Sequence, residues 1–354
     1  MSTQSNAASE IHKILRRNLE KDSKFLVMGL GVSDPKGVFG TTLGLSQEYG
    51  SHRVVETPTS ENAMTGIGVG LAISGYRPLM VHQRLDFFLL AMDQLVNSAA
   101  KWHFMFGGQV SVPLTIRLIT GRGWGQGPTH SQNLHAWFAH IPGLKVVMPS
   151  FAHEIGALLQ ASIDDPNPVI FIEDRWIHSQ TLEVSDSRVD KKIELGKANV
   201  VVEGKDLTVV SSGYMTIEAL KAITYLSKHG LSIELIDLRS IKPLDMETIT
   251  NSVRKTEHVL VVDSGHEIAS FGKEIIANIA MDNSLGLKTN PGLVALPDVP
   301  EPTSHGVIGE YRISSIKIAK GILNKLNREI PDDVEIELTP LKEDVPDANF
   351  TGPF

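Results

Sequence analysis

Residues 54–75 read VVETPTSENAMTGIGVGLAISG, and this stretch contains the unit from which the fold is built. It begins with a short β-branched run typical of a strand, turns at Pro-Thr-Ser, and continues into small and apolar residues typical of a helix. Glu61 is the only charged residue between the turn and Arg77. A strand followed directly by a helix is half of a β–α–β unit, so the stretch predicts an α/β fold with a mostly parallel sheet.

The same alternation continues along the chain. Short apolar runs that predict strands occupy 25–31, 78–83, 112–119, 144–149 and 168–173, with amphipathic stretches at 87–104 and 152–163. A second alternating set follows a charged segment. We therefore predict two doubly wound α/β domains, at 1–180 and 207–330, with a linker at 181–206 and an extended tail at 331–354.

Composition excludes several classes of protein. The chain is 42% hydrophobic and 21% charged, which is typical of a soluble globular protein. Its net charge of −8, without a dense basic block, argues against a nucleic-acid or membrane partner. The absence of cysteine favours an intracellular protein, and the first 23 residues lack the apolar core of a signal peptide. We expect a cytoplasmic location.

Glu61 has two interpretations. It can simply stabilise the positive end of the helix dipole, with Thr59 or Ser60 as the cap. Alternatively, the glycine-rich helix behind it packs closely and is buried, so that the carboxylate lies in a low dielectric where a shared proton becomes useful. The second interpretation also places Glu61 at the carboxyl end of a strand, where ligands bind in open α/β sheets.

The loop GRGWGQGPTHSQ, residues 121–132, is the second candidate site. It follows a predicted strand but does not have the glycine spacing of a dinucleotide-binding turn, since Gln126 stands where the third glycine would be. It is either a connecting loop with a structural histidine or a mobile active-site loop that carries His130 to a substrate.

The segment SIDDPNP, residues 162–168, is the third candidate. Its composition is typical of a simple turn. An oxygen-rich turn can also hold a cation through backbone carbonyls.

Taken in order, many motifs resemble the beta subunit of the thiamine-diphosphate-dependent 2-oxoacid dehydrogenases. They include RVVETPTSENAMTGIGVGLA, AMDQLVNSAAK, THSQ, HIPGLKVVMPS, DPNPVIFIE and PDVPEPTS, and they span nearly the whole chain. The resemblance implies a transketolase-like pyrimidine-binding domain followed by a transketolase C-terminal-like domain. It also implies oxidative decarboxylation of a small-molecule 2-oxoacid, with acyl transfer to lipoamide.

The resemblance also assigns residues. It implies that Glu61 hydrogen-bonds a ring nitrogen of the cofactor's aminopyrimidine and so activates the thiazolium carbon. Phe87 matches the aromatic residue that packs on the pyrimidine, and Gln83 and Thr59 match positions lining that pocket. His130 matches the histidine that faces the substrate and assists acyl transfer.

Metal ions and partner chains follow from the same resemblance. In some family members, potassium is bound largely through carbonyl oxygens at positions that match Leu114, Ser162, Asp165 and Asn167. The chain has no GDG segment followed by asparagines. The resemblance therefore implies that an alpha-type partner supplies the ligands of Mg²⁺ and of the diphosphate. A two-alpha, two-beta heterotetramer with a second beta subunit would be expected, and a lipoyl-bearing acyltransferase beyond it.

The sequence also departs from the family. Leu30 and Val81 stand where carboxylates are usual, and His82 and Arg84 add positive charge nearby. These changes favour substrates with an extra anionic or polar group. Two alternatives stay open: a split transketolase-like or synthase-like carboligase, and a non-catalytic assembly subunit.

Overall fold

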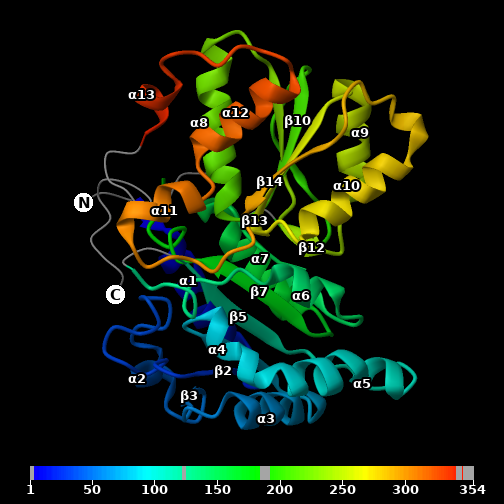
Figure 1. Ribbon diagram of the computed structural model, residues 1–354. Coiled ribbons are helices and arrows are strands. Elements are labelled where there is room, and N and C mark those ends of the chain that lie inside the picture. Colours follow the sequence, from blue (N-terminus) through cyan, green and yellow to red (C-terminus); the bar gives the residue numbers. More distant parts are fainter. Residues whose placement is uncertain (1–3, 122–124, 184–191, 340–344, 346–354) are drawn as a thin grey trace. The chain divides into compact units, whose positions relative to one another are not determined.

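The computed structural model describes residues 4–121, 125–183, 192–339 and 345. The chain divides into two compact units, one formed mainly by residues 1–121 and 129–195, the other by residues 122–128 and 196–353. Each unit contains its own parallel-rich sheet with helices on both faces (Figure 1). The predicted fold class, two doubly wound α/β domains, is therefore confirmed.

The sheet of the first unit is parallel throughout, with the strand order β6-β7-β5-β4-β2-β3. Its central strands are buried along their whole length, as their continuous apolar runs require. Its strands are β2 (Phe25–Gly29), β3 (Val54–Glu56), β4 (Arg77–His82), β5 (Thr115–Thr120), β6 (Lys145–Val147) and β7 (Val169–Asp174). A separate antiparallel pair joins β1 (Gln4–Asn6) to β8 (Thr181–Glu183).

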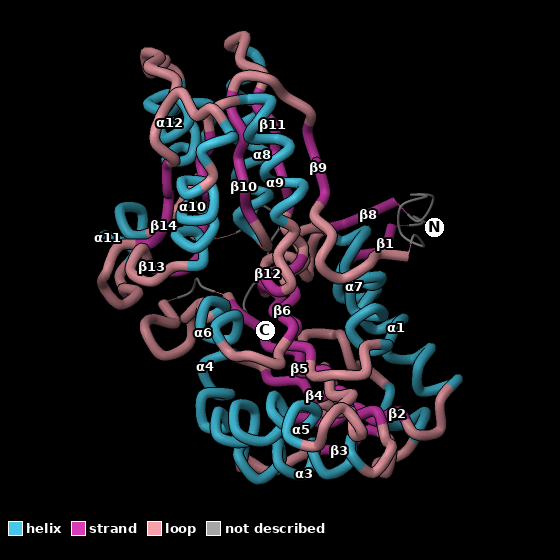
Figure 2. The backbone as a smooth tube through the Cα atoms, turned by 90° about the vertical axis from the view of Figure 1, so that its right-hand side faces the viewer, coloured by secondary structure: helices cyan, strands magenta, loops and turns pink. Residues whose placement is uncertain are grey.

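Helices cover both faces of this sheet. Figure 2 shows α1 and α7 side by side on one face and α3 to α5 on the other. The helices of the first unit are α1 (Ala7–Lys21), α2 (Leu45–Tyr49), α3 (Glu61–Ile73), α4 (Leu85–Phe88), α5 (Ala100–Met105), α6 (His135–His140) and α7 (Ala152–Asp164).

The amphipathic stretch 87–104 is not one regular helix. It passes from α4 through a 3₁₀ turn (Leu89–Ala91) and a π-helix (Gln94–Ala99) into α5. The spacing of apolar residues cannot separate these helix types over six residues, because the period of each differs from that of the α-helix by less than one residue per turn.

The second unit has the strand order β14-β13-β10-β11-β9, parallel except for β9. Helices α8 and α12 cover one face, and α9 and α10 cover the other (Figure 1). The strands of this sheet are β9 (Asn199–Val202), β10 (Leu207–Ser211), β11 (Ile233–Asp237), β13 (Val259–His266) and β14 (Gly292–Leu296), and the short strand β12 (Ser240–Lys242) is not part of it. Its helices are α8 (Tyr214–Lys228), α9 (Met246–Thr256), α10 (Phe271–Met281), η3 (Asn283–Leu285), α11 (His305–Tyr311), α12 (Ser315–Lys325) and α13 (Val334–Leu338).

The segments expected to link the domains and to end the chain contain regular structure. Strands β8 and β9 lie within 181–206, and β9 pairs antiparallel with β11. The short helix α13 lies within 331–354. Among the described residues, none of the helices has the length and hydropathy needed to cross a membrane.

Candidate functional site

The residues predicted to bind the cofactor or to face the substrate lie at one edge of the first unit's sheet. Strands β4, β2 and β3 are neighbours and run parallel, so their carboxyl ends meet at the same edge. Thr57, just beyond β3, donates its backbone N–H to the carbonyl of Gly29 at the end of β2, with an N···O distance of 3.2 Å. This edge is where open α/β sheets bind ligands.

Glu61 is the first residue of α3 at this edge. Ser60 is the N-cap but its side chain makes no capping hydrogen bond, and Thr59 is exposed in the turn before it. Glu61 is partly exposed, and its carboxylate makes no hydrogen bond or ion pair with another described residue. The expectation that α3 is buried is wrong for this chain, because only Thr65, Gly68, Val69 and Ala72 are buried and Ile67 is 48% exposed.

Gln83 follows β4 and reaches across to the end of β2. Its Nε2 atom donates to the carbonyl of Leu30 at 3.2 Å. A side chain at Gly31 would place its Cβ 2.3 Å from the same Nε2, and Gly31 has a φ of +79°. Glycine at this position is therefore what allows the amide of Gln83 to lie against the β2 loop.

A carboxylate that the sequence motifs did not single out holds this loop from the other side. Glu56, the last residue of β3, accepts hydrogen bonds from the Gly31 N–H at 2.5 Å and from the Ser33 N–H and hydroxyl at 3.0 and 2.7 Å. Burial raises the pKa of Glu56, but these hydrogen bonds outweigh it and lower the pKa below its usual range. The sequence did contain a signal for Glu56, because a glutamate that ends a strand lies at the edge of the sheet where ligands bind.

Phe87 and His130 are brought together from segments 43 positions apart. Their ring centroids are 5.4 Å apart, and the rings are nearly perpendicular at 85°. Phe87 remains 37% exposed, and the His130 Nδ1 lies 3.0 Å from the Thr129 hydroxyl. The structure therefore places the aromatic residue and the histidine at one point. Residues 122–124 of the same loop lie outside the described part of the chain.

The positive charge at this edge does not come from His82. Burial lowers the pKa of His82 to about 4, so its imidazole is neutral near pH 7 and the expectation of positive charge there is wrong. Arg84 is buried, with its guanidinium carbon 5.5 Å from the ring centroid of Phe39. Arg175, which the sequence did not indicate, lies 4.6 Å from the same centroid.

These two guanidiniums are close enough to affect each other. Burial and then the charge of Arg84 lower the pKa of Arg175 to about 10, while Asp174 opposes the shift. Phe39 presents its ring from a left-handed backbone, with a φ of +50°, which is uncommon for a bulky residue.

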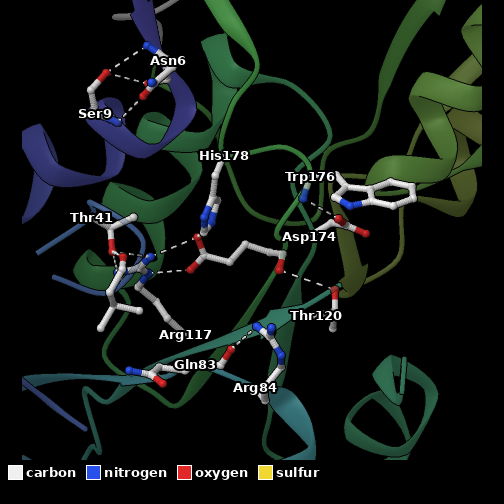
Figure 3. A network of polar contacts seen from close by, with 12 residues as sticks. Asn6, Ser9, Thr41, Gln83, Arg84, Arg117, Thr120, Asp174, Trp176 and His178 are labelled. Atoms are coloured by element: carbon white, nitrogen blue, oxygen red, sulfur yellow. Dashed lines mark hydrogen bonds and ion pairs between the residues drawn. The ribbon is translucent and has the colours of Figure 1, made fainter. Parts of the chain in front are cut away.

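Behind this edge lies a buried polar network (Figure 3). Arg117 on β5 donates from Nε and Nη2 to the two carboxylate oxygens of Glu173 on β7, at 2.6 and 3.0 Å. His178 Nε2 lies 2.7 Å from Glu173 Oε2, and the Arg117 guanidinium also contacts the Thr41 hydroxyl at 3.3 Å. Burial raises the pKa of Glu173, but the charge of Arg117 and the His178 hydrogen bond outweigh it and bring the pKa to about 2.

Of the residues suggested for potassium, Leu114 directly precedes β5, Ser162 lies near the end of α7, and Asp165 and Asn167 lie between α7 and β7. The Leu114 carbonyl accepts from the Val169 N–H at 3.0 Å, and the Ser162 carbonyl accepts from the Thr115 hydroxyl at 3.1 Å. Asp165 accepts from the Asn167 N–H at 2.9 Å and forms an ion pair with Lys145. A positive charge from the chain itself thus lies against Asp165, and a potassium ion here stays a prediction.

Comparison with known proteins gives matches over both units. The transketolase pyrimidine-binding domain matches residues 6–177, and the transketolase C-terminal domain matches residues 196–318. The chain is 38% identical over 294 residues to the mitochondrial pyruvate dehydrogenase E1 component subunit beta-1 of Oryza sativa subsp. japonica, covering 82% of this chain and 79% of that protein.

A bacterial relative and a solved structure agree with these matches. The pyruvate dehydrogenase E1 component subunit beta of Rhizobium meliloti is 40% identical over 289 residues, covering 81% of this chain and 62% of that protein. A split gene transketolase, solved as an inactive beta4 tetramer, superposes with a TM-score of 0.74 at 20% identity, covering 93% of this chain and 100% of that one. The solved structure supports the fold alone.

Proposed function

Because this chain belongs to the family of the pyruvate dehydrogenase E1 component beta subunits, we propose that it is the beta subunit of a heteromeric, thiamine-diphosphate-dependent 2-oxoacid dehydrogenase. The reaction proposed is decarboxylation of a 2-oxoacid with transfer of the acyl unit to lipoamide. One observation carries the proposal. Glu61 follows β3, and Gln83 and Phe87 follow β4, the two parallel strands on either side of β2, and the ring of Phe87 contacts that of His130.

The residues at this edge fit an aminopyrimidine. Glu61 is partly exposed and its carboxylate has no partner among the described residues, and Phe87 is an aromatic residue that is 37% exposed. Thiamine diphosphate, when bound, supplies the electron-accepting ring on which decarboxylation depends. Glu61 would hold a proton shared with a ring nitrogen, Phe87 would pack on the ring, and Gln83 and Thr59 would line the pocket.

His130 would act on the substrate side of the site. Its Nδ1 is close to the Thr129 hydroxyl, which leaves Nε2 as the ring nitrogen that can meet a ligand. A histidine exchanges a proton readily near neutral pH, as acyl transfer to a thiol acceptor requires.

The partner chains belong to this proposal. Within the part of the chain that the structure describes, there is no cluster of three histidine or acidic side chains able to bind a metal. We propose that an alpha-type subunit brings the ligands of Mg²⁺ and the diphosphate, in a heterotetramer with a second beta subunit. The exposed apolar side chains of Ile67, Leu90 and Phe104, which are 48%, 68% and 87% exposed, support subunit contacts on this unit. A lipoyl-bearing acyltransferase partner and a cytoplasmic location stay predictions.

A more specific substrate class is favoured by Arg84 and Arg175. Two guanidiniums packed on one phenylalanine ring, at the carboxyl ends of β4 and β7, suit a 2-oxoacid with a second anionic group. Competition between pyruvate and 2-oxoacids bearing a carboxylate or phosphonate tests this point. Equal specificity for pyruvate and the dianions would remove the proposed preference and leave the rest of the function intact.

The two alternatives make different predictions. A split carboligase would pass the two-carbon or acyl unit to an aldehyde, and product analysis with lipoamide and aldehyde acceptors separates it from the dehydrogenase. An assembly subunit would bind its partner without turnover.

Calorimetric titration of thiamine diphosphate and Mg²⁺ tests the shared site. We expect binding only when the alpha-type protein is present, and weaker binding for Glu61→Ala. Tight binding by the beta chain alone would contradict a site shared between chains. Full turnover in Glu61→Ala would remove the role of Glu61.

A further inference from the structure

The segment that carries His130 is anchored to the short helix α4 by a buried carboxylate. Asp86, in the first turn of α4, is 8% exposed. Its Oδ1 accepts two hydrogen bonds from Gln132, one from the side-chain Nε2 at 2.8 Å and one from the backbone N–H at 3.3 Å. One oxygen atom thus fixes both the backbone and the side chain of a residue 46 positions away.

The neighbouring residue of α4 makes the second attachment. Phe87 meets the ring of His130 edge to face, with centroids 5.4 Å apart. Two consecutive residues of α4 therefore hold two residues of the loop, Gln132 through hydrogen bonds and His130 through its ring. Residues 129–134 form turns and irregular backbone, so no ladder or helix fixes their place.

Of the two attachments, the hydrogen bonds of Asp86 cost more free energy to break. The second oxygen of Asp86, Oδ2, is buried and makes no hydrogen bond with any described residue. If Gln132 moved away while Asp86 stayed buried, Oδ1 would lose both of its bonds to Gln132, and leaving a buried carboxylate without these hydrogen bonds costs free energy. Asp86 therefore favours the arrangement in which the loop is held.

We propose that Asp86 is a positioning residue, which holds Gln132 and thereby keeps the imidazole of His130 against Phe87 at the reaction site. The catalytic consequence rests on the proposed function of His130. The anchoring itself rests on the contacts of Asp86 and is measurable without turnover.

Two substitutions at one position separate charge from geometry. Asp86→Ala removes the acceptor, whereas Asp86→Asn keeps an oxygen that can accept both Gln132 bonds. Asp164→Ala is the matched control, because Asp164 accepts a side-chain hydrogen bond from Gln160 at 2.9 Å on the exposed end of α7. Gln132→Ala breaks the same contact from the loop side and serves if Asp86→Ala folds poorly.

The first measurement is hydrogen–deuterium exchange over residues 128–134, together with the rate at which diethylpyrocarbonate modifies His130. In Asp86→Ala and Gln132→Ala we expect both rates to rise, exchange by about tenfold or more. Asp86→Asn and Asp164→Ala should stay near wild type. Unchanged rates in both Asp86→Ala and Gln132→Ala would overturn the anchoring.

The second measurement is acyl transfer by the enzyme assembled with its alpha-type partner. We expect kcat to fall by about 10- to 100-fold in Asp86→Ala, with little change in KM for the 2-oxoacid and with recovery in Asp86→Asn. Faster exchange with unchanged kcat would overturn the positioning role. If the wild-type assembly shows no transfer, the proposed function fails, and the exchange and modification rates still decide whether Asp86 holds His130.

Discussion

Arg117 and Glu173 form a two-point ion pair between β5 and β7, and both side chains are completely buried. Neither strand could carry its charged residue alone, because an isolated charge in this interior would be strongly destabilising. The ion pair therefore fixes the register of β5 relative to β7 behind the candidate site.

Replacing one partner of this ion pair should therefore destabilise the protein more than replacing both partners. We expect Arg117→Met to lower the free energy of unfolding by about 3–5 kcal/mol, because Glu173 loses its main counter-charge. The double variant Arg117→Met/Glu173→Gln should recover part of that loss. Urea unfolding measures the stability of the single and the double variant. Arg16→Met removes one partner of the exposed ion pair with Glu48, and this control should change the stability only slightly. A double variant less stable than the single one would contradict this account.

The buried imidazole of His82 predicts a pH dependence of stability. Its pKa in the folded protein, about 4, lies below its ordinary value of 6.5, so the unfolded chain binds more protons between these pH values. Stability should then fall as the pH is lowered through this window. From about pH 7.5 to about pH 5 we expect wild type to lose about 1–2 kcal/mol more than His82→Met, measured by urea unfolding. Parallel pH profiles would show that His82 is not the group responsible.

Two glycines with nearly the same φ allow the Gln83 contact to be tested. Gly31→Ala and Gly40→Ala both force alanine into the left-handed region, at φ values of +79° and +80°, at a cost of about 1–2 kcal/mol. Only at Gly31 would the new Cβ meet Gln83, since nothing lies within 4 Å at Gly40. We expect thiamine diphosphate to bind more weakly, by calorimetry with the alpha-type partner, in Gly31→Ala alone. Equal weakening in both variants would mean that backbone strain, not Gln83, is responsible.

Glu61→Gln should separate charge from shape at the start of α3. The amide keeps the size of the side chain but cannot hold a shared proton as a carboxylate does. We expect kcat for decarboxylation to fall by about 10²- to 10⁴-fold with the fold unchanged by circular dichroism. Glu48→Gln, on the surface pair with Arg16, is the matched control and should keep wild-type activity. A loss smaller than about threefold would leave Glu61 with only its helix-dipole role.

The strands of the first unit could be predicted because buried parallel strands are continuous apolar runs. The position of Glu61 at the carboxyl edge then followed from the order of strands and helices, whereas Gln83 was indicated only by the family resemblance. The same patterns failed where exposure mattered, since α3 is glycine-rich, yet only four of its residues are buried in this chain.

The contacts that sequence could not supply join distant segments. The contact of Asp86 with Gln132 and the contacts of Arg84 and Arg175 with Phe39 depend on which segments lie side by side, and no local pattern states that order. The charge of His82 was misjudged for a related reason, because its burial comes from Phe88 and the sheet rather than from its sequence neighbours.

Strand β9 has a practical consequence for dividing the chain. It is the antiparallel edge strand beside β11 and precedes β10 by only a few residues. A fragment cut just before Leu207 would lack it, and β11 would present a row of unpaired N–H and C=O groups to other molecules. Such a fragment should associate with other copies through the exposed edge of β11, whereas a fragment that begins at Gly196 keeps β9 paired with β11.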